Sequence, residues 1–505
     1  MSHVLVTLNK NVDYEEFWNQ MEHDTTDAEC ECVPNRVVDC SNRKPLSNRT
    51  TEYDLTDHEI EHLKHDERVM GIDVLPPENA KQLLATQTGT FARSSSTNSA
   101  HINWALRRCT ESIIESSPGN TYDYNLDGTG VDVVIQDNGV MSGHPDFEDA
   151  DGNTRFIEHN WYSAAGISGS MSSNHYGDVG SHGTHVASTV AGKLYGWAKN
   201  AKIYSIRFDS GGGISDGDEF DLIRLWHEQK PIDPNTGFKR PTIVNASWGY
   251  RWFYPGNGSQ GGTITELNYR GTNRGTATST IYGNTNSTHN IYGITSIDAA
   301  TEDLTDAGVI FVKAAGNYYH KQDLVGGADY DNHYICSDTW AGIVSAGNPI
   351  YYHRPGSPHS DDAIVVGNVY TFPNGTTQER LSSSSEKGPR CDIFAPGSHI
   401  TAATNSAGYS TNSAYPGNSS YKIAKISGTS MASPQVCGIL ALFLQVNPHA
   451  TTADCKKFLT DNSQSIMDMG NSTGTDYSDG SSTQGGPNRF LHLPWNSSNM
   501  LTVST

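Results

Sequence analysis

Ser430 lies in a stretch whose residue types and spacing suit nucleophilic chemistry. Residues 426–434 read Ile-Ser-Gly-Thr-Ser-Met-Ala-Ser-Pro, a small-residue turn that predicts the start of a helix. Apolar residues at core spacing continue this helix until Pro448: Val436, Ile439, Leu440, Leu442, Phe443 and Val446. At a helix start, a backbone N–H lacks an intrahelical partner and the positive end of the helix dipole is close. Both features favour acyl transfer by a serine, because they stabilise the developing negative charge; the alternative is a serine that only caps a buried helix.

Three further polar residues stand where strands or helices are expected to end or begin. Asp137 ends an apolar strand, His182 opens a predicted helix, and Asn317 follows another strand after a glycine. Taken singly, each has an ordinary explanation, such as an Asx turn, a surface histidine or a turn asparagine. The functional interpretation of Asn317 is a side-chain donor to an oxyanion. His185 lies one turn after His182, but no acidic partner with ligand spacing follows on that helix, so no metal site is expected.

The elements that must position these residues alternate along the chain from Asn103 onward. Strands are predicted at 131–137, 201–206, 242–247, 309–314 and 363–367, and helices near 184–194, 218–228, 296–306 and 430–446. This alternation predicts an α/β fold, a parallel sheet covered by helices on both faces. Functional sites of such sheets lie at the carboxyl ends of the strands, where Asp137, Ser247 and Asn317 are found. Gly249, after Ser247 and Trp248, would let a peptide backbone come close.

Composition and charge narrow the class of protein. The chain has 505 residues, a net charge of −22 and no block of Lys or Arg, which argues against nucleic-acid binding. No apolar run approaches the roughly 20 residues that span a membrane, so no membrane partner is expected. Residues Met1–Thr7 lack the basic start and long apolar centre of a signal peptide. We therefore expect an intracellular or particle-associated protein, with export by an unusual route left open. The eight Cys show no metal-ligand spacing and do not decide disulfide pairing.

The first part of the chain differs from the rest. Residues 1–78 are predicted to form a small domain with the order strand, helix, strand, helix, strand, which suggests a split βαβ layer. Its second strand is placed at Arg36–Asp39, and its second helix has Thr56 as N-cap with Glu59 at capping-box spacing. Residues 79–102 are polar and are predicted to be an exposed linker with a processing site. The main domain follows at 103–505.

Asp137, His182, Asn317 and Ser430, in this order and these local contexts, resemble the site of the subtilisin-like serine proteases, the subtilase family. The motifs that carry the resemblance are Val133–Gly139, Ser181–Ala187, Ala314–Asn317 and Gly428–Pro434, with further landmarks at 103–106, 392–397 and 487–491. Almost the whole chain is covered, because residues 1–78 resemble the inhibitory propeptide of that family. The resemblance implies a three-layer fold with a mostly parallel central sheet, plus a small α+β ferredoxin-like prodomain.

The resemblance also implies roles for the matching residues. Ser430 would attack the peptide carbonyl, His182 would carry the proton, and Asp137 would orient His182. Asn317 and the Ser430 N–H would form the oxyanion hole. Substrate contacts are implied for Ser247, Trp248, Gly249, Ala314, Ala315 and Gly316. No cofactor is required for catalysis. The resemblance allows structural calcium, which members of the family often bind, and names no ligands for it in this chain.

Several features depart from the family pattern. Trp248 stands where a smaller aliphatic residue is usual, which predicts a narrower cleft, and Tyr250 replaces a common glycine. Residues 251–295 are a polar insertion, predicted to form a loop over the cleft that restricts access; a remote surface loop is the alternative. A second expansion spans 318–360. The segment from Asp123 to Gly128 resembles the start of a calcium loop, but its twelfth position is not acidic, so we expect a turn.

These observations predict a serine endopeptidase made as a zymogen, with its own propeptide in cis and protein or peptide substrates. One alternative is a catalytically silent structural or virion-associated protein with the same fold. Low hydrophobic content, 35%, and polar insertions motivate that alternative. Another is a peptide ligase or macrocyclase, in which an amine instead of water intercepts the acyl-enzyme.

Overall fold

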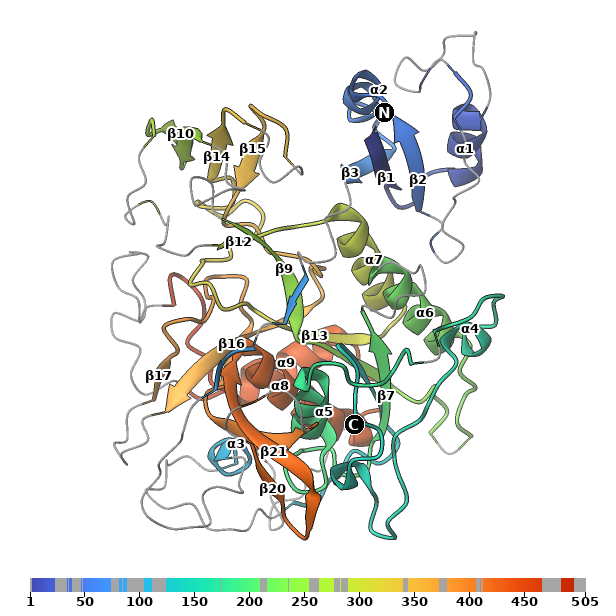
Figure 1. Ribbon diagram of the computed structural model, residues 1–505, viewed down its shortest axis with the longest axis vertical. Coiled ribbons are helices and arrows are strands. Elements are labelled where there is room, and N and C mark those ends of the chain that lie inside the picture. The colour runs from blue at the N-terminus through green and yellow to red at the C-terminus, as the bar shows by residue number, and fades with distance from the viewer. Residues whose placement is uncertain are drawn as a thin grey trace.

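The computed structural model shows a small N-terminal domain set on a larger α/β body (Figure 1). The boundaries predicted at 78 and 102 stay predictions, because residues 74–80 and 89–103 lie outside the described part. The structure describes residues 2–22, 34, 36–38, 47, 49–73, 81–83, 85–88, 104–110, 124–172, 174–208, 216–234, 236–253, 263–276, 282, 289–338, 344–371, 379–405, 409, 412–465 and 483–494.

The N-terminal domain packs helices against a small antiparallel sheet. Its elements are β1 (Ser2–Leu8), α1 (Tyr14–Glu22), β2 (Thr50–Leu55), α2 (Asp57–Leu63) and β3 (Val69–Asp73). The sheet order is β2-β1-β3, and β1 is antiparallel to both neighbours. β2 and β3 therefore run parallel with β1 between them, so β2–α2–β3 is a split βαβ unit, as predicted.

The strand predicted at Arg36–Asp39 is wrong as far as it is described, because residues 36–38 are not in a strand and β2 takes that place. Val38 is buried, and its N–H donates to the carbonyl of Met21 at 2.8 Å, so a buried loop residue gave the strand-like pattern. Arg36 donates to Glu59 at 2.6 Å, and this bond lowers the pKa of Glu59 to about 2. Glu59 also completes the predicted capping box with Thr56.

The central sheet has the order β17-β16-β13-β8-β6-β7, with β18 also paired to β16. Its strands are β6 (Asp132–Asp137), β7 (Lys202–Arg207), β8 (Thr242–Ala246), β13 (Ile310–Ala314), β16 (Ile364–Thr371), β17 (Glu379–Leu381) and β18 (Ile393–Pro396). All of these pairings are parallel except that of β17. Each strand predicted for this domain is confirmed, and the carboxyl ends of β6, β8 and β13 share one edge.

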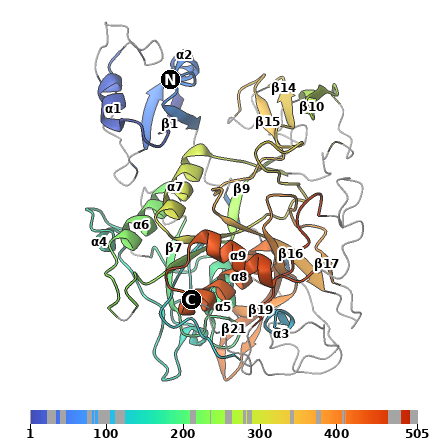
Figure 2. The same ribbon diagram turned by 180° about the vertical axis from the view of Figure 1, so that it is seen from behind.

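Helices cover both faces of the sheet, which confirms the three-layer prediction (Figures 1 and 2). Val133 and Ile135 of β6 join the core under α5 (His182–Ala191) and α8 (Thr429–Val446). Val134 points to the opposite face, where α6 (Asp216–Glu228) and α7 (Thr295–Asp306) pack. Further helices are α3 (Trp104–Arg108), η3 (Pro145–Phe147), α4 (Trp161–Ala164) and α9 (Thr452–Asn462). Within the described chain, α8 alone has the length and composition of a membrane span, but it is 83% buried, as expected of a core helix.

Two small sheets lie at the carboxyl edge of the central sheet. One has the order β12-β9-β4, formed by β12 (His289–Ile291), β9 (Trp248–Phe253) and β4 (Lys81–Leu83). The other joins β19 (Ile400–Thr404), β21 (Asn418–Gly428), β20 (Ser413–Tyr415) and β5 (Ala85–Thr88). The prediction of an exposed linker is therefore wrong for 81–83 and 85–88, because these residues form paired strands. Their polar sequence gave no sign of the partners.

The two expansions of the main domain fold together. β10 (Ile264–Tyr269) and β11 (Thr272–Asn273) come from the first, and β14 (His333–Cys336) and β15 (Pro349–Tyr351) come from the second. They form a sheet of order β11-β10-β14-β15 around buried Leu267, Tyr334 and Tyr352. The described part of 251–295 is thus strand-rich and not a simple loop, and this sheet lies far from α5 and α8 (Figure 1). Whether the insertion restricts access stays a prediction.

Candidate active site

Asp137 and His182 are hydrogen-bonded to each other at the carboxyl edge of the sheet. Asp137 is the last residue of β6, and His182 is the first residue of α5. Nδ1 of His182 lies 2.8 Å from Oδ1 and 3.0 Å from Oδ2 of Asp137, and both side chains are fully buried. Because a carboxylate only accepts, Nδ1 carries the proton and Nε2 is the basic nitrogen. Among the described residues, Nε2 has no hydrogen-bond partner.

Ser430 lies in the first turn of α8 and bonds reciprocally with Ser247. The Ser430 hydroxyl donates to the Ser247 carbonyl at 3.0 Å, and the Ser247 hydroxyl donates to the Ser430 carbonyl at 3.1 Å. The second bond has a cause in the sequence, because Pro434 has no N–H for the carbonyl four residues before it. In this conformation the described contacts of Ser430 do not include a hydrogen bond to His182, although α5 packs against α8.

Asn317 is held against the residue that precedes the nucleophile. Its Oδ1 accepts from the N–H of Thr429 at 3.0 Å and from the Thr429 hydroxyl at 3.2 Å. Thr429 Oγ1 also accepts from the N–H of Gly316 at 3.1 Å. These bonds assign the oxygen of the amide, so its NH₂ group is turned the other way. The sequence analysis missed Thr429, although its place directly before Ser430 was a usable signal.

The backbone before Asn317, predicted to contact substrate, is bonded within the protein. The Gly316 N–H donates to Thr429, and the Gly316 carbonyl accepts from the N–H of Glu386 at 2.9 Å. The Ala315 carbonyl accepts from Gln322 Nε2 at 2.6 Å. Ala314, the end of β13, is fully buried. This segment can therefore form the wall of a substrate pocket, but its bonded N–H groups are not available to pair with a substrate backbone.

Glu386 is a buried carboxyl behind this wall that the sequence analysis missed. Gln322 donates to it, and burial raises the pKa of Glu386 to about 8, although Gln322 and the nearby Lys313 charge act in the opposite direction. A Cβ placed on Gly316 would come within 2.4 Å of Glu386 Oε1, and φ there is +125°, so only glycine fits. No local motif marks Glu386 or Gln322, because they meet only through the fold.

Trp248 supports β9 from inside the core. Its ring is fully buried, with centroids 5.3 Å from Phe208 and 6.4 Å from Phe220, and its indole N–H donates to Gln136 at 3.2 Å. Tyr250, two residues further along, is also buried, and its hydroxyl donates to the carboxylate of Asp216 in α6. The prediction that Trp248 narrows the cleft is therefore wrong, because the side chain fills the core beneath the strand.

The N-terminal segment pairs on both sides of the nucleophile. β4 is antiparallel to β9, with Leu83 opposite Trp248, and β5 is antiparallel to β21, with Ala85 opposite Gly428. Trp248 directly follows the residue whose carbonyl holds the Ser430 hydroxyl, and Gly428 is two residues before Ser430. The close approach of a peptide backbone that was predicted at Trp248 and Gly249 is thus made by a segment of this chain itself.

The segment that resembles the start of a calcium loop is described only in part. Asp127 Oδ1 accepts from the N–H and the hydroxyl of Thr129 at 3.0 and 2.7 Å, which is the predicted turn; Asp123 lies outside the described residues. No group of three or more metal-ligating side chains occurs in the described part of the chain. His185 Nε2 lies 3.1 Å from the Ile400 carbonyl, and burial lowers the pKa of His185 to about 3, so it is a neutral structural histidine.

Comparison with known proteins places this arrangement in a family. The sequence profile of the Subtilase family matches residues 128–490, which is more than half of the chain and includes all three triad residues. The chain therefore belongs to the subtilase family, the class of subtilisin-like serine proteases.

Among individual relatives, an extracellular serine proteinase of Thermus sp. (strain Rt41A) is 26% identical over 80% of this chain and 68% of its own length. Alkaline serine exoprotease A of Vibrio alginolyticus is 25% identical over 70% of this chain, but only 45% of that protein is covered. The chain spans about half the length of several curated relatives. Fervidolysin from Fervidobacterium pennivorans, a keratinolytic enzyme related to subtilisin, shares the fold, with a TM-score of 0.52 and 18% identity over 96% of this chain and 60% of that one.

Proposed function

We propose that this chain is a serine endopeptidase that hydrolyses peptide bonds through an acyl-enzyme on Ser430. The observation that carries the proposal is the Asp137–His182 pair at 2.8 Å, whose Nε2 has no partner among the described residues, on a helix packed against α8. Proteins and peptides are the substrates that suit the cleft, because β9 and β21 bind extended backbone through main-chain hydrogen bonds.

In the reaction, the Ser430 hydroxyl leaves the Ser247 carbonyl and turns to Nε2 of His182. Nε2 takes the proton as the oxygen attacks the substrate carbonyl, and Asp137 stabilises the imidazolium. The Asn317 amide and the Ser430 N–H bind the negative oxygen. His182 then protonates the leaving amine as the C–N bond breaks. A water that gives its proton to His182 hydrolyses the ester and restores the Ser430 hydroxyl.

In this proposal residues 1–78 are an inhibitory propeptide that acts in cis. Helix α7 has no side-chain cap of its own, and Asp73 of the N-terminal domain supplies one. The Asp73 carboxylate accepts from the N–H groups of Thr295 and Ser296 at 3.1 and 2.8 Å. Arg49 adds an ion pair with Asp303 of α7 at 2.8 Å. These contacts hold the domain on the face opposite α5 and α8, where its tail can reach the cleft.

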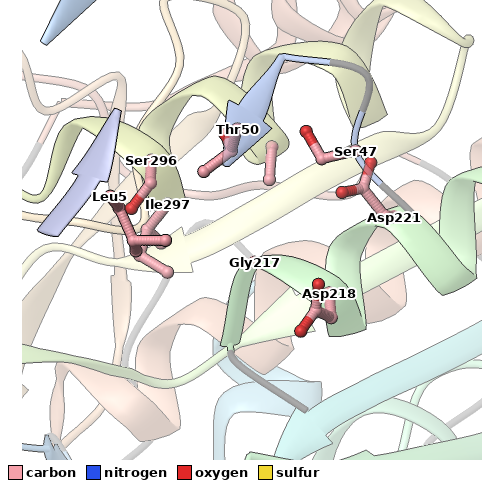
Figure 3. Close-up of a pocket in the computed structure, with 9 residues that line it drawn as sticks. Leu5, Ser47, Thr50, Gly217, Asp218, Asp221, Ser296 and Ile297 are labelled. Carbon is pink, nitrogen blue, oxygen red and sulfur yellow. The ribbon is translucent and has the colours of Figure 1, made fainter. Parts of the chain in front are cut away.

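The rest of this contact is closely packed. Figure 3 shows Leu5 of β1 beside Ile297 of α7, and Ser47 beside Asp221 of α6. The cavity left between them is about 10 Å³, close to the smallest that holds one water. Burial raises the pKa of Asp221 to about 8, although Arg224, which pairs with this carboxyl at 3.0 Å, acts in the opposite direction. This packing of the N-terminal domain against α6 and α7 is what we expect of a propeptide that stays bound to the enzyme until it is cleaved off.

The processing bond follows from the strand pairing. β4 ends at residue 83 and β5 begins at residue 85, and their partners converge on Ser430. A chain that crosses from β9 to β21 must pass the nucleophile, so we expect self-cleavage at a bond that flanks residue 84. Cleavage there separates the inhibitory domain from the main domain.

A fluorophosphonate probe tests the proposed activity. Wild-type protein should take up one adduct on Ser430, and a Ser430→Ala variant should take up none. A folded wild type that stays unlabelled would favour the silent, particle-associated protein. Product mass separates hydrolysis from ligation or macrocyclisation, because an added amine changes the mass of the acyl product. An intracellular or particle-associated location is part of the proposal and is tested by fractionation of the native source.

A further inference from the structure

A polar pocket opens beside the strand that leads to the nucleophile. Its volume is about 110 Å³, and it is lined by residues of β16, β17, the loop 382–384 and the end of β21, together with Ser398. Ser427 and Gly428 contribute the wall nearest to Ser430. Neither the family match nor the triad chemistry assigns a role to this pocket.

The pocket lies on the leaving-group side of the substrate. Ser427 is opposite Gln87 of β5, and Gly428 is opposite Ala85. Ala85 and Gln87 both come after residue 84, which flanks the bond that we expect to be cut. In an antiparallel pair, residues directly opposite each other project to the same face of the sheet. A substrate residue that takes the register of Gln87 therefore projects to the face of Ser427.

The chemistry of the lining selects for an anion. Arg380 supplies a guanidinium, which lies over the ring of Tyr370 at 5.8 Å, and serine hydroxyls line much of the remainder. The residues that line the pocket, all within the described chain, include no carboxylate. This is a local exception on a chain with a net charge of −22. Hydroxyl and guanidinium donors together suit a carboxylate oxygen.

The walls of the pocket are fixed by their own hydrogen bonds. The Ser427 hydroxyl accepts from the N–H of His399 at 2.8 Å, and the Ser398 hydroxyl donates to Asn368 Oδ1 at 3.3 Å. The hydroxyls of Ser382 and Ser384 lie 3.2 Å apart. Because these side chains are already held in place, little conformational entropy is lost when a ligand binds in the pocket.

We propose that this pocket binds the carboxylate side chain of an Asp or Glu in the substrate, at the position that pairs opposite Ser427, the register that Gln87 takes in this chain. Arg380 is the specificity-determining residue for this position. The inference rests on the proposed endopeptidase function and names a preference of that same cleft.

The test uses internally quenched peptides with residues 80–90 of this chain that differ only at the position of Gln87, which is Glu, Gln or Lys. With the processed enzyme, kcat/KM for the Glu peptide should exceed that for the Lys peptide by about tenfold, because the exposed ion pair and the like-charge pair each contribute about threefold. The preference should shrink at high salt. Arg380→Ala should reduce it to less than about twofold, and Arg380→Glu should reverse it.

Arg274 provides a matched control, because it is also exposed and lies over a tyrosine ring, that of Tyr282 at 5.6 Å. Arg274→Ala should keep the wild-type preference. Fluorophosphonate labelling at the wild-type rate shows that each variant keeps its active site. A Glu preference that survives in Arg380→Glu, or no Glu preference in a wild type that labels normally, overturns the inference. Loss of labelling in the wild type would instead contradict the proposed function.

Discussion

The two strands beside the nucleophile bind backbone in the same way but are supported differently. β9 rests on buried aromatic rings, with Trp248 fully buried against Phe208 and Phe220. β21 ends beside a pocket of hydroxyls and one guanidinium, with Arg380 exposed at its rim. On the first side the nearby side chains belong to the core, and on the second they face a cavity.

We infer from this difference that the side chains under β9 contribute to the stability of the fold, whereas those near β21 contribute to substrate selectivity. A substrate residue that pairs with β9 meets a strand whose own side chains are already committed to packing. A residue that pairs with β21 meets polar groups that can discriminate between charges. We therefore expect changes under β9 to alter folding, and changes near β21 to alter which peptides are cut.

The largest effect should come from breaking the support of β9. Trp248→Ala leaves a cavity among Phe208, Phe220 and Tyr250 and an unpaired Gln136 oxygen, which should lower the free energy of unfolding by about 3–5 kcal/mol. Trp248→Phe, the matched control, keeps most of the ring and loses only the N–H donor, at about 1–2 kcal/mol. Urea unfolding in a Ser430→Ala background measures both without self-digestion. A loss below about 1 kcal/mol for Trp248→Ala would contradict this role of β9.

The next prediction concerns Asn317, which we expect to act in the chemical step and not in substrate binding. Asn317→Ala should lower kcat by about 10²–10³-fold with little change in KM, the size of effect measured for such a donor in subtilisin itself. Steady-state kinetics on one peptide gives both constants. An equal rise in KM with kcat unchanged would show that Asn317 binds the ground state and not the oxyanion.

The third prediction concerns the domain that places β4 against β9. Asp73→Ala removes the cap of α7 and should weaken the seating of the N-terminal domain by about 0.5–2 kcal/mol. Limited proteolysis of the full chain in a Ser430→Ala background should then release this domain faster. Asp54→Ala is the control, because Asp54 is exposed and pairs with His3 inside the N-terminal domain. Equal rates for both variants would remove Asp73 from the contact.

The fourth prediction is a pH dependence at the wall of the cleft. Glu386 has a pKa of about 8 in the fold, against an ordinary value of 4.5, because it is buried. Between these values the folded state holds a proton that the unfolded state has lost, so the contribution of Glu386 to stability falls as pH rises from about 4.5 to 8. Glu386→Gln should flatten this fall in urea unfolding at pH 5 and 8. An unchanged slope would mean that Glu386 is ionised in the fold.

The smallest effect completes the comparison. Arg380→Ala should change the free energy of unfolding by less than about 0.5 kcal/mol, because Arg380 is exposed and away from the core. The same unfolding experiment that is used for Trp248→Ala measures it. A loss of several kcal/mol would show that the pocket is structural, and the contrast between the two strands would then fail.

Local sequence was sufficient for the central sheet and for the paired catalytic residues. Apolar runs of five or six residues, each followed by a polar residue, predicted β6, β8 and β13 and so placed Asp137, Ser247 and Asn317 at one edge. The Ser430 turn was readable because small residues precede a strongly apolar helix. These signals are strong because the buried strand and helix patterns are set by the chain itself.

Other parts depended on partners that are far away in sequence. β4 and β5 are polar segments that become strands only because the edges of β9 and β21 are open to them. Gln322 and Glu386 meet behind Gly316 through side chains 64 residues apart. β10 and β14 come from separate expansions; each pairs with a neighbour in its own expansion, but the pairing of β10 with β14, which connects the two expansions, joins strands about 65 residues apart in sequence. Tertiary contact decides such features, so sequence periodicity does not reveal them.

Intact-mass analysis of freshly folded full-length protein, wild type beside Ser430→Ala, tests the central claim most directly. We predict that the wild type cuts itself at a bond flanking residue 84, and that Ser430→Ala stays at full length under the same conditions. The same fragments from both proteins, or a folded wild type that never cuts, would contradict the account that Ser430 acts on the segment paired at its two sides.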